Sequence, residues 1–96
     1  MIVEWTEEAL ADLDEVLGHY QSHSPEVARR MPERVLGSEA VIQTFPKSGK
    51  YDQETDTYDA YVPHTRLILT YRITDEITQI IRVWHTSRDP ETKPER

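Results

Sequence analysis

Cysteine is absent from this 96-residue chain. The chain therefore has no disulfide, thiolate metal site or cysteine nucleophile, and its composition fits a reducing compartment. The N-terminus has no basic region followed by an apolar run, so it does not predict a secretory signal. No apolar stretch approaches the ~20 residues that a membrane-spanning helix requires. We expect a cytoplasmic protein without a membrane partner.

Positive charge is also scarce: the formal net charge is −7 and the pI is near 5.0. Because phosphate contacts need a basic surface, this charge argues against a general nucleic-acid-binding protein. The charge is uneven, however. The first 15 residues carry no lysine or arginine but hold Glu4, Glu7, Glu8, Asp12, Asp14 and Glu15. The C-terminal third holds Arg66, Arg72, Arg82 and Arg88, so a local basic face is compatible with the sequence.

A chain of this length predicts one domain with a limited core. Its hydrophobic content of 36% and charged content of 30% fit a globular protein on the polar side of average. We expect a single domain over residues 1–88. Residues 89–96 include two prolines and no apolar side chain, so we expect them to form a flexible tail.

Two amphipathic helices are predicted after a short strand at residues 2–5. Thr6 is a suitable N-cap for the first helix, because threonine is among the residues preferred at that position. Acidic residues follow it in the first helical turn, where the helix dipole favours negative charge. Apolar positions at three- and four-residue steps predict this helix over residues 7–20, with Gly18 weakening its end. Its apolar face consists of Leu10, Leu13, Leu17 and Tyr20.

The second helix is predicted to begin at Ser24-Pro25, where a hydroxyl cap precedes a proline at the first helical position. Its apolar face consists of Val27, Met31, Val35, Ile42 and Phe45. Pro32 lies inside this pattern, and an interior proline costs roughly 3 kcal/mol. We expect a kink or a break into two pieces there, and the end of the element at Phe45-Pro46.

Three strands are predicted after a polar surface loop at residues 47–56. They cover residues 57–62, 66–73 and 77–85, and the last two are joined by a short turn and should pair antiparallel. The last strand has apolar residues on both faces, as expected of a central strand. The order β-α-α-β-β-β predicts an α+β fold, with both helices on one face of a small, mostly antiparallel sheet.

The pairing register decides where the arginines point. If residues 73 and 77 pair, the face under the helices holds Leu67, Leu69, Tyr71, Ile73, Ile77, Ile81, Val83 and His85. The other face then collects Arg66, Arg72 and Arg82 with Ile68, Ile80 and Trp84. Arginine beside an aromatic ring suits the recognition of phosphate or carboxylate with stacking. The alternative, which the pattern alone favours, is an exposed face whose arginines pair with local acids.

His85 ends the last strand, where a general acid or base could reach a cleft. Its parity with Val83 instead favours a histidine that points to the helix side and is hydrogen-bonded to the backbone. Arg88, just past the strand, could fold over either face. The candidate catalytic residues are thus Arg66, Arg72, Arg82, His85 and Arg88, none of them decisive.

Metal and cofactor sites are not predicted. His19 and His23 have helical metal-ligand spacing, but no third ligand is evident, and histidine is favoured near a helix end by the dipole. Phosphate-binding and dinucleotide-binding glycine patterns are absent.

Several segments, in their order and spacing, resemble the RelE/ParE superfamily of bacterial type II toxins over nearly the whole chain. They are "VEWTEEALADLDEV", "SPEVARR", "TFP", "YVPHTRLILTYRI" and "ITQIIRVWHTSRDP". The pair Tyr71-Arg72 and the segment "RVWHTSRD" are closer to the ParE branch than to the RelE branch.

The resemblance implies a toxin that a cognate antitoxin neutralises by wrapping its C-terminal segment over the helices and sheet. ParE-like members act on DNA gyrase, whereas RelE-like members cut messenger RNA, usually in the ribosome, with basic residues and an acid/base residue on the concave sheet face. By position, Arg66 or Arg72, Arg82, and His85 or Arg88 would fill those roles here. Oligomers are expected only within the toxin–antitoxin complex.

Two features depart from the family pattern. RelE-like ribonucleases are typically basic, so the net charge of −7 argues against docking on ribosomal RNA. Pro32 interrupts the second helix where relatives usually run continuously. We therefore expect a ParE-like gyrase inhibitor; the alternatives are a RelE-like ribonuclease and a non-toxic relative that only binds antitoxin.

Overall fold

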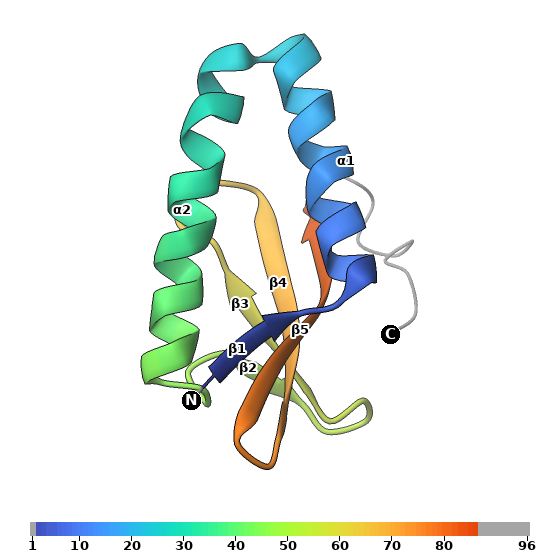
Figure 1. Cartoon of the computed structure of the whole chain (residues 1–96), viewed down its shortest axis with the longest axis vertical. Coiled ribbons are helices and arrows are strands. Elements are labelled where there is room, and N and C mark those ends of the chain that lie inside the picture. Colours follow the sequence, from blue (N-terminus) through green and yellow to red (C-terminus); the bar gives the residue numbers. More distant parts are fainter. Residues whose placement is uncertain (1, 87–96) are drawn as a thin grey trace.

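Two helices cover one face of a five-stranded sheet in the computed structural model, which describes residues 2–86 (Figure 1). The elements are β1 (Ile2–Trp5), α1 (Glu7–His23), α2 (Pro25–Thr44), β2 (Lys50–Asp52), β3 (Thr57–Tyr61), β4 (Leu67–Thr74) and β5 (Ile77–His85). The strand order is β1-β5-β4-β3-β2, with β1 parallel to β5 and the other pairs antiparallel. The predicted α+β class is confirmed. The predicted surface loop at residues 47–56 is partly wrong, because it contains the edge strand β2.

Helix α1 begins as predicted. The Thr6 hydroxyl accepts a hydrogen bond from the Ala9 backbone N–H at 3.1 Å. The helix continues to His23, beyond the predicted end at residue 20, because one glycine does not stop a helix whose inner face is packed. Ala9 is the buried centre of that face, and this places Leu10 at its margin with 52% of its surface exposed. The prediction that Leu10 lies in the core is therefore wrong.

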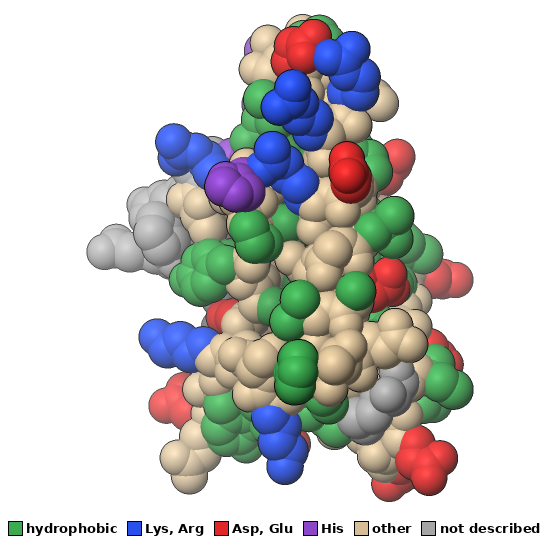
Figure 2. All heavy atoms as spheres, turned by 90° about the vertical axis from the view of Figure 1, so that its left-hand side faces the viewer, with side chains coloured by type: hydrophobic (Ala, Val, Ile, Leu, Met, Phe, Trp, Pro, Cys, Tyr) green, Lys and Arg blue, Asp and Glu red, His purple; other side chains and the backbone are tan. Residues whose placement is uncertain are grey.

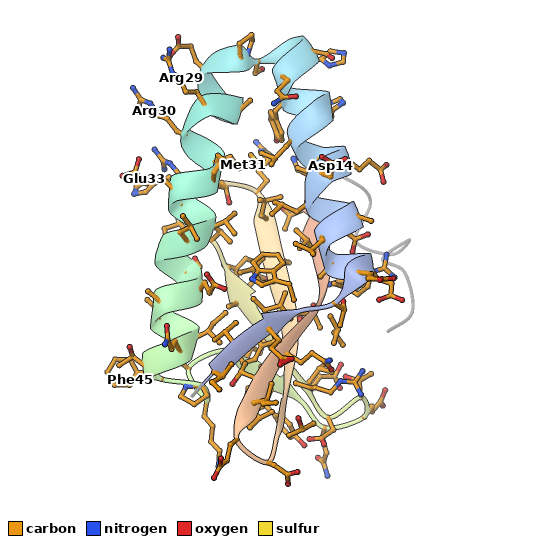
Figure 3. All side chains as sticks on the ribbon, viewed as in Figure 1. Asp14, Arg29, Arg30, Met31, Glu33 and Phe45 are labelled. Atoms are coloured by element: carbon orange, nitrogen blue, oxygen red, sulfur yellow. The ribbon has the colours of Figure 1, made fainter. Side chains whose placement is uncertain are left out.

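Helix α2 is continuous through Pro32, so the predicted alternative of a break into two pieces is wrong. Proline removes one backbone donor, but apolar residues on both sides still bury a regular stripe. That stripe consists of Ala28, Met31, Val35, Ser38 and Ile42. Met31 points from α2 toward the interior in Figure 3. Val27 and Phe45, which were predicted to face the core, are exposed.

The β4–β5 register contains a bulge that the sequence analysis did not predict. Thr74 pairs with Ile77 next to the turn, so the predicted pairing of residues 73 and 77 is wrong by one. Farther along, Tyr71 pairs with Ile80 and Thr70 pairs with Arg82, which leaves Ile81 as the extra residue. A one-residue insertion reverses the side-chain parity of the strand.

The bulge changes which residues reach the core. Ile80 is fully buried in the main hydrophobic cluster, on the face where Ile81 was predicted. Thr78 likewise takes the side predicted for Ile77, since it pairs with Ile73. Beyond the bulge, Val83 and His85 keep the side that was predicted for them.

A buried tyrosine anchors the segment between α2 and β2. The Tyr71 hydroxyl donates to the Pro46 carbonyl at 2.8 Å and accepts from the Gly49 N–H at 3.0 Å. A Cβ on Gly49 would lie 2.7 Å from that hydroxyl and 2.8 Å from the Asp59 carbonyl oxygen, so only glycine fits this approach. Burial raises the pKa of Tyr71, which keeps the hydroxyl protonated as a donor.

Candidate functional site

Arg82 lies on the sheet face opposite the helices but reaches around the edge of β5 to α1. Its Nε donates to Asp12 Oδ2 at 2.7 Å and its Nη2 donates to Oδ1 at 3.2 Å. The hydrogen bond that Arg82 donates to Asp12 is the largest cause of the raised pKa of Arg82. The same Oδ2 accepts the Val83 backbone N–H at 3.0 Å. Arg82 is therefore held by a two-point ion pair.

Trp84 is nearly buried on the same sheet face, where the sequence predicted a tryptophan beside arginines. It is 7% exposed, and its indole N–H donates to Thr70 Oγ1, which in turn donates to Asp59 Oδ1 at 2.7 Å. The Arg82 guanidinium carbon lies 5.5 Å from the ring centroid, within cation–π range. With this little surface exposed, the ring offers hardly any stacking area to a nucleobase.

His85 points to the helix side, as its parity predicted. Its Nε2 shares a hydrogen bond with the Tyr20 hydroxyl of α1. The two ring centroids lie 5.4 Å apart. His85 and Arg82 thus belong to opposite faces of the sheet.

The remaining candidate arginines are dispersed. Arg66 is exposed in the turn before β4, and its carbonyl accepts the Thr86 N–H at 2.7 Å. Arg72 is exposed toward the other end of β4, opposite Gln79. Arg88 and the predicted tail, residues 89–96, lie outside the described residues. The described candidates do not converge on one cleft.

His19 and His23 stack on one another with centroids 4.4 Å apart, and His23 Nδ1 is 2.9 Å from the His19 carbonyl oxygen. Within residues 2–86, no cluster of three or more histidine, aspartate or glutamate side chains could hold a metal ion. Over the same stretch, neither helix is both long and apolar enough to cross a membrane.

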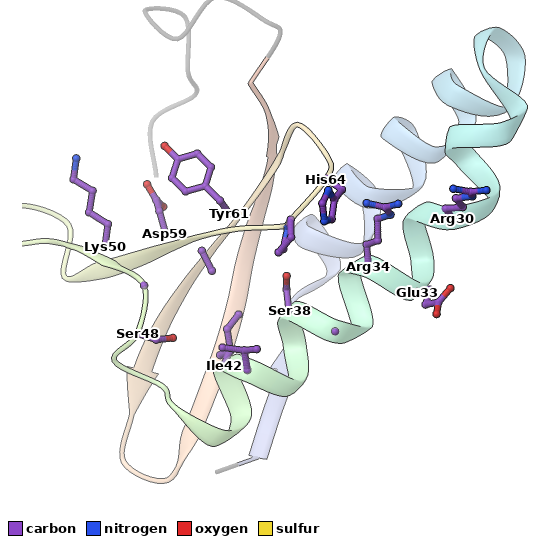
Figure 4. Close-up of a pocket in the computed structure, with 15 residues that line it drawn as sticks. Arg30, Glu33, Arg34, Ser38, Ile42, Ser48, Lys50, Asp59, Tyr61 and His64 are labelled. Carbon is purple, nitrogen blue, oxygen red and sulfur yellow. The ribbon is translucent and has the colours of Figure 1, made fainter.

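A hollow with a volume of about 840 Å³ lies between α2 and β3 (Figure 4). We call it the α2–β3 groove. Ile42 and Ala60 contribute apolar side chains to it, and the exposed Val41 and Tyr61 flank it. Its cationic side chains are Arg30, Arg34 and Lys50, and His64 also lines it. Figure 2 shows this side of the molecule, with Lys and Arg side chains gathered over its upper part and hydrophobic ones below.

Arg34 is a groove residue whose side-chain hydrogen bonding is incomplete. Its Nη1 is buried and has no hydrogen-bond partner among the described residues. In Figure 4, Arg34 extends from α2 toward His64 of the β3–β4 turn, whereas Glu33 points away. The Arg34 guanidinium therefore has a hydrogen-bond donor without an acceptor among the described residues.

Sequence reasoning missed this groove, although a signal was present. Arg30, Arg34 and Val41 recur at helical spacing outside the buried stripe of α2, so they share a second face of that helix. The sequence pattern does not show where β3 lies, and β3 forms the other side of the groove.

Comparisons with known proteins agree with this fold. Residues 3–90 match the family described as the ParE toxin of type II toxin-antitoxin system, parDE. The chain is 29% identical over 86 residues to Toxin RelE2 of Caulobacter vibrioides, covering 90% of this chain and 96% of that protein.

Two solved structures have the same fold. A chain of the chromosomal ParDE TA system from P. aeruginosa superimposes with a TM-score of 0.76 at 22% identity, covering 88% of this chain and 95% of that one. The isolated E. coli RelE toxin gives a TM-score of 0.54 at 16% identity, covering 95% and 89% of the two chains.

Proposed function

Because this chain belongs to the family of ParE toxins of type II toxin–antitoxin systems, we propose that it inhibits DNA gyrase by binding it and that a cognate antitoxin holds it inactive. One domain over residues 1–88 would carry both interactions, with residues 89–96 as a tail, and both partners would be met in the cytoplasm.

The dispersal of the candidate catalytic groups is the observation that supports a binding protein. Acid–base cleavage of RNA needs a proton-transfer group and a cation around one phosphate, within about 3 Å of the reacting atoms. Here His85 contacts Tyr20 on one side of the sheet, and Arg82 contacts Asp12 from the other. The net charge of −7 further disfavours a phosphate backbone as the partner.

Supercoiling of relaxed plasmid by purified gyrase tests the proposal. Antitoxin-free protein is expected to inhibit the reaction in a concentration-dependent manner, and pre-incubation with the antitoxin should abolish the effect. Full supercoiling activity at every concentration of the free protein would sink the gyrase proposal.

A RelE-like ribonuclease is the second candidate, since the relative from Caulobacter vibrioides is named Toxin RelE2. In that case Arg82 would stabilise the charged transition state and His85 would move protons. The substitutions Arg82→Ala and His85→Ala, in variants shown by circular dichroism to be folded, should then each abolish growth arrest. Full growth arrest by both variants would rule this candidate out. Unchanged growth on induction of the wild type without antitoxin would instead indicate a non-toxic relative.

A further inference from the structure

A tight turn places a histidine at the α2–β3 groove, in a position that favours glycine. The turn spans residues 62–65 and is closed by a hydrogen bond from the Thr65 N–H to the Val62 carbonyl at 3.2 Å. Pro63 occupies its second position, and His64 occupies the third with a φ of 61°. This is the pattern of a type II turn, whose third position favours glycine because positive φ strains other residues. The His64 side chain is therefore retained against a conformational cost, and it lines the groove.

Two arginines approach this histidine from α2. Arg30, Arg34 and Ser38 follow one another at steps of four residues, which aligns them on one stripe of the helix, and all three line the groove. In Figure 4 the side chains of Arg34 and His64 lie next to each other, with Arg30 farther along α2. Figure 2 likewise shows a histidine beside Lys and Arg side chains on this face. Nitrogen donors from two elements therefore meet at one end of the groove.

The Arg34 guanidinium is incompletely paired at this point. Its Nη1 is buried, and no described residue accepts a hydrogen bond from it. Because a buried donor without an acceptor is unfavourable, an oxyanion here would supply a hydrogen bond that the protein does not. The acids at the groove leave the position open, since Glu33 points away in Figure 4 and Asp59 accepts a hydrogen bond from Thr70. The site is suited to an anion from outside the chain.

The number of donors favours a phosphate monoester as that anion. A carboxylate carries one negative charge, whereas a phosphate monoester carries about −1.5 to −2 and offers three acceptor oxygens. Three oxygens match the separate donors on Arg30, Arg34 and His64, and guanidinium groups recognise phosphate well. A nucleic-acid strand would require cations for successive phosphates, and the net charge of −7 opposes it. A small ligand requires only the local charge.

The rest of the groove has room for an organic group. Its volume of about 840 Å³ falls within the roughly 300–1,000 Å³ that is typical of small-molecule sites. Val41, Ile42 and Ala60 contribute apolar side chains to the lining. Val41 follows Arg34 by seven residues, which places it about 10 Å farther along the helix. A ligand of nucleotide size could therefore hold its phosphate at the arginines and lay an apolar or planar group on this surface.

We propose that the α2–β3 groove binds a small phosphate monoester of the size of a nucleoside monophosphate. The phosphate accepts hydrogen bonds from Arg30, Arg34 and His64, and the organic group lies on the apolar part of the groove. This site uses neither Arg82 nor His85 and does not rest on the gyrase proposal, so a failure of gyrase inhibition would leave it unaffected.

Binding of adenosine 5′-monophosphate to the full chain tests the proposal. Isothermal titration calorimetry should show one saturable site, for which inorganic phosphate competes. Adenosine, which lacks the phosphate, and succinate, which presents carboxylates, should each bind about tenfold more weakly or worse. No saturable binding of the nucleotide at millimolar concentration would overturn the proposal, and so would equal affinity for succinate. Displacement by oligouridine without a terminal phosphate, more readily than by inorganic phosphate, would assign the groove to nucleic acid and overturn it as well.

Substitution of Arg34 locates the bound nucleotide. Arg34→Gln should weaken nucleotide binding about tenfold or more, because it removes the buried donor that the phosphate would satisfy. The matched control is Arg29→Gln, since Arg29 is exposed on the same helix and pairs with Glu26. Equal affinities of the two variants would place the nucleotide elsewhere and contradict the proposed site.

The variant His64→Gly separates ligand binding from folding. Glycine fits the third position of the turn, so the free variant should melt at the wild-type temperature or higher. Loss of the ring should nevertheless weaken nucleotide binding about threefold or more. The rise in melting temperature at a fixed nucleotide concentration should shrink accordingly. Unchanged nucleotide affinity would overturn the role of His64, whatever the melting temperature of the free variant.

Discussion

At the scale of single residues, Asp12 joins α1 to β5 with more contacts than the sequence suggests. One carboxylate accepts three hydrogen bonds, from Arg82 Nε, Arg82 Nη2 and the Val83 N–H. In the sequence, Asp12 is one of several acids near the N-terminus, and nothing distinguishes it from Asp14. Only the position of α1 along the edge of β5 makes it a structural residue.

We predict that Asp12→Ala lowers the free energy of unfolding by about 1–3 kcal/mol, because three partly buried N–H donors lose their acceptor. Asp14→Ala is the matched control, since Asp14 is exposed on the same helix and should change stability by less than about 0.5 kcal/mol. Urea denaturation followed by circular dichroism measures both. Equal stabilities of the two variants would contradict the role of Asp12.

Gly49 provides a second residue-scale prediction. Gly49→Ala should destabilise the protein by about 1–3 kcal/mol, because its methyl group would collide with the Tyr71 hydroxyl and the Asp59 carbonyl. Gly18→Ala, where a Cβ meets no atom within 4 Å, should instead stabilise α1 by about 0.5–1 kcal/mol. Thermal unfolding of the pair is the measurement, and changes of the same sign would refute the steric explanation.

At the scale of elements, β5 shows where pattern reading fails. Its bounds are predicted correctly at residues 77–85, because apolar density and the preceding turn mark them. Its register is wrong near the turn, because strict alternation cannot place both Ile80 and Val83 in the core. The bulge at Ile81 resolves this conflict. The adjacent pair Ile80-Ile81 is the sequence feature that corresponds to it.

Helix α2 leads to an element-scale prediction. Pro32 is exposed within a continuous helix, so Pro32→Ala should restore one backbone hydrogen bond without disturbing the core. We expect stabilisation by about 1–3 kcal/mol, the helix gain being partly offset by greater freedom of the unfolded chain. A lower melting temperature for this variant would mean that the proline relieves strain in α2.

At the scale of the whole molecule, charge is separated between two regions. Acids crowd the β1–α1 segment, while cations gather at the α2–β3 groove. The ion pairs among residues 2–86 include Arg29–Glu26 and Arg82–Asp12, but the 18 acidic residues of the chain outnumber its 11 lysines and arginines. Self-repulsion of this kind destabilises a compact chain.

Raising the ionic strength from about 0.01 M to about 0.15 M should therefore raise the melting temperature of the free protein, because screening weakens that repulsion. Differential scanning fluorimetry across a salt series measures this melting temperature. A melting temperature that falls with salt would show that attractive pairs dominate.

The sequence by itself determined the class of the fold, the order of its main elements and the helix-side position of His85. These follow from periodicity, capping and strand parity, which are local properties of the chain. The tertiary structure alone decided the bulge at Ile81, the pairing of Arg82 with Asp12, and the α2–β3 groove. Each of these depends on how distant segments approach one another, and local sequence patterns do not encode that approach.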